Sequence, residues 1–307
     1  MIVNYLKWIK RTGVRFLKPA VAAFQQHLIR LNLEEPKPRV AVYPYITGDA
    51  FLALADVCHL SDRWSFPVTL RESPEALRVY FFEIDGLSFQ DVKKNIIQNR
   101  IVIFHNGDAP LSREDISILK RYNCRVFATN TPRQEGFIEP IPIGIENVHH
   151  RRNGSLHYYN PLKLAGLSLE KKKDILVSFS VNTNVAERTR VMKICQEYGF
   201  ENEKMKVGEF RQRLAQSRFV ISPPGNGIDC HRTWEAMYHK TIPVIETRYN
   251  LFPHIDLPIL TVNSYQNFFK MSLDDRLSQY HKIMSRSYPA IYMDYWIELI
   301  NNARKQI

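Results

Sequence analysis

Residues 217–246 constrain the fold more than any other stretch of this sequence. An apolar run at residues 218–222 ends at two prolines, and a second run at residues 242–245 follows a helical pattern that opens at Asp229. Strand, loop, helix and strand in this order form the unit of a parallel sheet, because the crossover helix returns the chain to the same end of the sheet. The segment therefore predicts an α/β fold.

The same alternation of strand-length apolar runs and helical patterns extends along most of the chain. The predicted strands are residues 40–45, 79–84, 101–104, 125–128 and 138–145, and then 175–180, 218–222, 242–245 and 259–262. A polar break at residues 146–172 separates the two series, which predicts two Rossmann-like domains facing each other across a cleft. The expected divisions are residues 1–36, 37–150, 151–172, 173–272 and a helical tail at 273–307.

Composition limits the kinds of ligand and the cellular compartment that we expect for this protein. The net charge is +11, from 42 basic and 31 acidic residues, which favours an anionic partner. No RNP-like aromatic motif, zinc finger or continuous basic stripe occurs, so nucleic acid is not expected among the partners. The four cysteines form no CxxC pair, and no apolar run reaches the about 20 residues that cross a bilayer. We therefore expect a reduced, cytoplasmic protein.

Residues 1–33 have a basic amphipathic pattern, and residues 34–39 form a polar linker with prolines. Lysines and arginines interrupt the apolar positions, which is not typical of a signal peptide. One interpretation is a helix packed on the protein's own surface. The other is a helix lying in the plane of an anionic membrane, with Trp8 at the interface.

The loop and helix after residue 222 carry residues suited to an anion. In Gly225-Asn226-Gly227 the glycines let a ligand approach the backbone, and the helix that follows presents unpaired N–H groups and a positive dipole end. His231 and Arg232 would add charge, and Glu235 would accept sugar hydroxyls. Such a loop is also an ordinary turn, and a His-Arg pair is commonly solvated. Their place after a strand, where open α/β sheets bind ligands, favours the pocket.

These residues resemble a known family. Residues 219–237, FVISPPGNGIDCHRTWEAM, and the later Ile242-Pro243-Val244 are similar to the C-terminal motif of exostosin-like glycosyltransferases of the bacterial type. Segments 105–108, 141–147 and 178–184, with Arg188, extend the resemblance over residues 100–250. It implies a GT-B fold, a donor held by the C-terminal domain, and neither a catalytic metal nor another cofactor. Eukaryotic members have a membrane anchor and lumenal disulfides, which are not evident in this sequence.

The resemblance also assigns roles to individual residues. Residues 173–272 would bind the nucleotide-diphosphate sugar donor, and residues 37–150 would face the acceptor. The expected donor contacts are Asn184, Gly225, Asn226, Gly227, His231, Arg232 and Glu235. Arg188 would stabilise the leaving diphosphate. The acceptor base would be Asp49, His105 or Asp108, which lie in loops after the predicted strands.

The leading functional prediction is a glycosyltransferase that uses a nucleotide-diphosphate sugar to extend a glycan or lipid-linked acceptor in cell-surface polysaccharide synthesis. An anionic membrane surface is a further partner if residues 1–33 bind it, which would place the enzyme at the inner face of the membrane. Two alternatives stay open: a pyruvyl- or phosphate-transferring enzyme that modifies glycans, and a non-catalytic protein that binds nucleotides or glycans.

Overall fold

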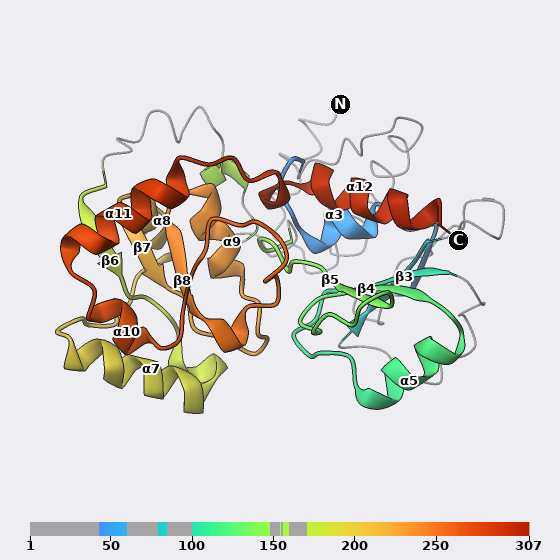
Figure 1. Ribbon diagram of the computed structural model, residues 1–307, viewed down its shortest axis with the longest axis horizontal. Coiled ribbons are helices and arrows are strands. Elements are labelled where there is room, and N and C mark those ends of the chain that lie inside the picture. Colours follow the sequence, from blue (N-terminus) through green and yellow to red (C-terminus); the bar gives the residue numbers. More distant parts are fainter. Residues whose placement is uncertain are drawn as a thin grey trace, which may run out of the picture.

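The computed structural model describes residues 43–59, 79–84, 100–147, 154, 156–159 and 171–306. Within them the chain forms two α/β units, which Figure 1 shows side by side, each built on a parallel sheet. The predicted α/β class is confirmed at this level. The predicted helical region at residues 1–33 and most of the connection at 151–172 lie outside the described residues.

The first sheet has five strands in chain order. They are β1 (Val57–His59), β2 (Val79–Glu83), β3 (Ile101–His105), β4 (Arg125–Ala128) and β5 (Ile138–Pro140), and every neighbouring pair is parallel. Four of them match predicted strands, although β5 ends five residues earlier than predicted. The prediction for residues 40–45 is wrong in its described part, because residues 43–45 form a turn and a bend. β1 was not predicted.

The second sheet has four parallel strands, also in chain order. They are β6 (Lys173–Leu176), β7 (Ser217–Ile221), β8 (Ile242–Glu246) and β9 (Leu260–Val262). All four were predicted, although β6 ends four residues earlier than expected. Beyond Leu176 the chain bonds to residues 202 and 203 and not to a strand: the Val177 carbonyl accepts the N–H of Glu203 at 2.9 Å, and the N–H and C=O of Phe179 bond to the side chain of Asn202.

Helices cover the faces of both sheets. They are α3 (Gly48–Leu52), α5 (Arg113–Arg121), α7 (Val185–Glu197), α8 (Val207–Ala215), α9 (His231–Tyr238), α10 (Tyr265–Phe269), α11 (Leu273–Met284) and α12 (Met293–Arg304), with 3-10 turns η6 (Leu156–Tyr159), η7 (Val181–Thr183), η8 (Thr247–Tyr249) and η9 (Pro289–Ile291). Side chains alternate along β7, so Phe219 packs with α7 and α10 while Val220 packs with α8 and α9. Both faces are therefore buried, which is why the strands read as continuous apolar runs.

The predicted helical tail joins the two units. α11 lies along the second sheet, and α12 crosses back over α3 of the first unit (Figure 1). Trp296 of α12 is fully buried in one hydrophobic cluster with Phe81 and Ile103 of the first sheet and with Trp234 and Tyr238 of α9. The two units therefore share a packed apolar core in addition to any groove between them.

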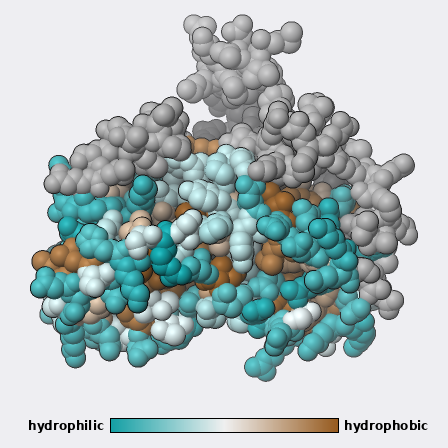
Figure 2. All heavy atoms as spheres, turned by 45° about the horizontal axis from the view of Figure 1, so that its top comes forward, coloured by the Kyte–Doolittle hydropathy of each residue, from teal (hydrophilic) through white to brown (hydrophobic). Residues whose placement is uncertain are grey.

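The surface that the structure describes is largely polar. Figure 2 shows a face on which hydrophilic side chains predominate and apolar ones are scattered. Among the described residues, the large hydrophobic side chains classed as exposed are Val185, Leu273 and Tyr292. None of the helices in these ranges is long and apolar enough to cross a membrane.

Candidate functional site

The candidate site is built on the loop that follows β7. The N–H of Gly225 donates to the carbonyl of Gly227 at 2.9 Å and to the Cys230 thiol at 3.1 Å, which closes a tight turn. α9 begins at His231 and not at Asp229 as predicted, because the Asp229 carboxylate accepts the N–H of Cys230 at 2.9 Å while Asp229 itself stays outside the helix. The N-terminus of α9 nevertheless lies directly after this loop.

Arg188 binds the backbone of this loop through its guanidinium. Its Nε donates to the carbonyl of Pro224 at 2.8 Å, its Nη2 to that of Pro223 at 3.2 Å, and its Nη1 to that of Ser180 at 2.7 Å. A Cβ atom at Gly225 would lie 2.8 Å from Nη2 of Arg188, so the loop needs glycine there for close packing. The prediction that Arg188 contacts the leaving group is therefore revised: its guanidinium bonds to the loop backbone, and burial lowers its pKa.

Arg232 lies in the first turn of α9 and has the least satisfied charge of the site. Its Nε and Nη1 are buried and have no hydrogen-bond partner among the described residues. Burial, and secondly the positive charge of Arg188, lower the pKa of the Arg232 guanidinium to about 10. Tyr265 is fully buried, and its hydroxyl likewise has no hydrogen-bond partner among the residues that the structure describes. Buried donors without acceptors are costly, so this arrangement is suited to an anion.

Two more of the predicted donor residues contact loops of the first sheet. The exposed Asn226 donates through Nδ2 to a carboxylate oxygen of Asp108 at 3.1 Å. Nδ1 of His231 lies 2.7 Å from the carbonyl oxygen of Gly144, and its Nε2 lies 3.6 Å from a Glu146 oxygen. The structure thus brings the loop after β7 beside Asp108, one of the predicted bases.

Asn184 caps α7 and also reaches the loop. Its side-chain oxygen accepts the N–H of Glu187 at 3.3 Å, and its Nδ2 donates to the carbonyl of Gly225 at 3.0 Å. Both the oxygen and the nitrogen of the Asn184 amide therefore bond within the protein. The structure places Asn184 against the loop, as predicted, but its amide contacts the loop backbone.

Glu235 lies away from the loop, contrary to its predicted role. Its Oε1 accepts hydrogen bonds from the Tyr159 hydroxyl at 2.8 Å and from Nη2 of Arg211 at 2.9 Å. Arg211 is 2% exposed, and its guanidinium lies over the Tyr159 ring. Since removing Glu235 would leave a buried cation, we assign it to the packing of α8 against α9. Trp234, expected to be a core residue, is fully buried.

The two remaining candidate bases differ in their surroundings. The Asn106 N–H donates to Nδ1 of His105 at 2.7 Å, so Nε2 carries the proton and donates to the Pro142 carbonyl at 3.1 Å. Burial lowers the pKa of His105 to about 4. This neutral core ring has both nitrogens bonded, and we do not keep it as a base. Asp49 lies in α3 at intermediate exposure, and its N–H donates to Asn147.

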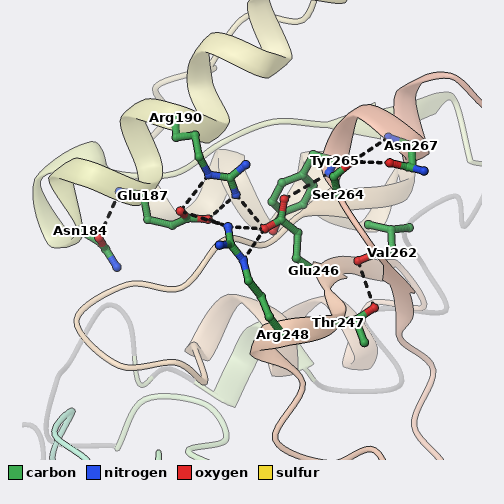
Figure 3. Close-up of polar contacts among 10 residues, drawn as sticks. All are labelled: Asn184, Glu187, Arg190, Glu246, Thr247, Arg248, Val262, Ser264, Tyr265 and Asn267. Atoms are coloured by element: carbon green, nitrogen blue, oxygen red, sulfur yellow. Dashed lines mark hydrogen bonds and ion pairs between the residues drawn. The ribbon is translucent and has the colours of Figure 1, made fainter.

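A network of charges lies at the carboxyl end of β8, beside the loop (Figure 3). Glu246 is 1% exposed and accepts hydrogen bonds from Arg190 at 2.7 Å and Arg248 at 2.6 Å. The same two arginines contact Glu187, and the N–H of Tyr265 donates to Glu246 at 3.3 Å. The network fixes the start of α7 against β8, and so fixes the position of Arg188.

Sequence reasoning missed two contributors to the site, Asn130 and the carboxylate of Asp229. Asn130 follows β4, and its Oδ1 accepts the N–H of Asp229 at 2.8 Å. The only signal available in the sequence was the place of Asn130 after a predicted strand.

Among the residues that the structure describes, no group of three or more His, Cys, Asp or Glu side chains is placed to hold a metal ion. Comparisons with protein-family models and with curated proteins found no match for this sequence.

Proposed function

We propose that this protein is a glycosyltransferase whose donor is a nucleotide-diphosphate sugar. The observation that carries the proposal is Arg232, whose Nε and Nη1 are buried behind a glycine loop at the start of a helix and have no hydrogen-bond partner among the described residues. A diphosphate would supply the acceptor oxygens that these donors lack. The N-terminus of α9 and the net charge of +11 favour the same ligand.

The arrangement of the two sheets supports a GT-B enzyme. The donor loop follows β7 of the second sheet, and its Asn226 lies beside Asp108, which follows β3 of the first. An acceptor hydroxyl entering from the first unit would therefore meet a carboxylate next to the donor. We propose Asp108 as the base and Asp49, on the neighbouring α3, as the second candidate.

Donor binding is the first test. Calorimetric titration of the intact protein with UDP, GDP, ADP and dTDP should give saturable binding of at least one nucleotide. Arg232→Ala should weaken it about 10- to 100-fold, because a charge-assisted phosphate contact is lost. Arg218→Ala is the matched control, since Arg218 lies at the opposite end of β7. Unchanged affinity in folded Arg232→Ala, or equal losses in both variants, would contradict the proposed donor site.

Turnover separates the enzyme from the two alternatives. A glycosyltransferase releases nucleoside diphosphate from the bound donor only when an acceptor glycan is present. Asp108→Asn should then abolish turnover while donor affinity changes by less than about threefold, as expected for a group that acts on the acceptor. Donor binding without turnover on any acceptor would favour a non-catalytic binding protein. Transfer of pyruvyl or phosphate to a glycan would favour the glycan-modifying enzyme.

The cytoplasmic membrane surface is proposed as the place of action. This rests on the basic amphipathic pattern of residues 1–33. Basic residues near an anionic bilayer each contribute about 1 kcal/mol, and salt screens this attraction. Full-length protein should therefore bind vesicles containing phosphatidylglycerol at low salt, and protein lacking residues 1–33 should not. Equal binding by both proteins would contradict a membrane role for this segment.

A further inference from the structure

The donor loop is held in place by the opposite unit through one buried side chain. Asn130 is fully buried and has a left-handed backbone with φ of 55°. Its Oδ1 accepts the N–H of Asp229 at 2.8 Å, and its Nδ2 lies 3.5 Å from the carbonyl oxygen of Gly107. Asn130 thus links a loop of the first sheet to the segment between Gly227 and α9.

The loop glycine facing Asn130 is explained by this contact. A Cβ atom at Gly227 would lie 2.5 Å from Nδ2 of Asn130 and 2.7 Å from its Oδ1 and Cγ. The backbone of Gly227 lies outside the left-handed region, so an alanine there meets the Asn130 side chain without backbone strain. Gly227 therefore makes room for a protein side chain.

Asp229 completes the link in the other direction. Its Oδ2 accepts the N–H of Ile143 at 2.9 Å, and both carboxylate oxygens accept the indole N–H of Trp234, at 2.9 and 2.8 Å. Asn130 and Asp229 therefore connect the loops after β4 and β5 to the loop after β7. Movement of one unit against the other would pull directly on the donor loop.

We infer that Asn130 is a positioning residue for the donor loop: its side chain, seated against Gly227 and bonded to Asp229, sets the loop geometry that the donor site requires. The inference rests on the proposed function where donor affinity is the readout. In a simple division of labour, the first unit would bind only the acceptor and the second only the donor. This inference gives the first unit a part in donor binding as well.

The test is a double-mutant cycle with an expected rescue. Gly227→Ala should weaken nucleoside diphosphate binding about tenfold through overlap with Asn130, and Asn130→Gly should weaken it by a smaller factor. The double variant should bind more tightly than Gly227→Ala alone, because removing the Asn130 side chain makes room for the new methyl group. Asn123→Gly is the matched control: Asn123 is an exposed residue with a similar φ of 51°, after α5 and away from the loop.

Hydrogen exchange of the ligand-free protein gives a readout that does not depend on a nucleotide. In Asn130→Gly, the amides of residues 225–230 and of Ile143 should exchange faster, whereas those of β6 and β8 should not change. Additive losses in the cycle, or unchanged exchange in the loop, would overturn the positioning role of Asn130. Absence of nucleotide binding to the wild-type protein would refute the proposed function, and the exchange rates would still decide the role of Asn130.

Discussion

Arg232→Met should stabilise the ligand-free protein while it weakens anion binding. Burial and the charge of Arg188 lower the pKa of Arg232 from 12.5 to about 10. One pKa unit corresponds to about 1.4 kcal/mol, so holding this cation without a bound anion costs about 3 kcal/mol of the free energy of unfolding. The cost is present at every pH below about 10, where the group is charged in both states. Methionine removes the charge and keeps much of the apolar stem.

Allowing for imperfect packing of methionine, we expect the free energy of unfolding to rise by about 1–3 kcal/mol, and Tm by roughly 2–6 °C. Thermal and urea unfolding of both proteins without ligand would measure this. At about 100 times the wild-type Kd, a nucleoside diphosphate should stabilise wild type by about 2.7 kcal/mol and the variant, whose affinity is about 10- to 100-fold lower, by only about 0.4–1.4 kcal/mol. If Arg232→Met is less stable than wild type without ligand, the guanidinium has a stabilising partner and the reasoning is refuted. Arg218→Met controls for removal of an arginine.

Three further predictions concern the groups around the loop. Arg188→Lys should lower the free energy of unfolding by about 2–4 kcal/mol in urea, because one ammonium cannot reproduce the fork that serves three carbonyls; a loss below about 0.5 kcal/mol would contradict this role. Glu246→Ala should cost about 1–3 kcal/mol, because the buried N–H of Tyr265 loses its acceptor, whereas Arg248→Ala, at an exposed site, should cost less than about 1 kcal/mol; equal losses would contradict the network. Burial lowers the pKa of His105 to about 4 in the folded protein, against about 6.5 in the unfolded chain. As the pH falls, the unfolded chain therefore takes up a proton at this histidine before the folded protein does, and the free energy of unfolding should decrease between about pH 6.5 and about pH 4. His105→Gln should reduce that slope, and an unchanged slope in unfolding series across this pH range would rule the residue out as its source.

The strands were predictable where both faces of a sheet are covered. Residues 101–104 read as a continuous apolar run because one face of β3 packs toward α12 and the other toward α5. In the run at residues 40–45, Tyr45 is buried for another reason: it packs among the rings of Tyr159 and Tyr238 and does not pair in a sheet. β1 was missed because three residues with a histidine give too short a pattern.

The place of the loop after β7 was predictable, but the partners of its side chains were not. Gly225 and Arg232 could be placed after β7 because loops at the carboxyl ends of parallel strands meet at one edge. Spacing along α9 could not tell that Glu235 faces Arg211 of α8. Nor could it show that Asn130 bonds to Asp229, 99 residues later in the chain. Such pairings depend on how helices and sheets pack, which local patterns do not encode.

The return of α12 to the first sheet affects the order in which the protein can fold during synthesis. The strands of the first unit leave the ribosome early, but Trp296 and Ile300, which cover one face of that sheet, are made nearly 200 residues after β3. Until they arrive, Phe81 and Ile103 lack part of their cover, and exposed apolar strands are prone to aggregate. The N-terminal half should therefore depend on chaperones for longer than its position in the chain suggests. A nascent chain stalled before residue 293 should remain sensitive to protease in the first unit.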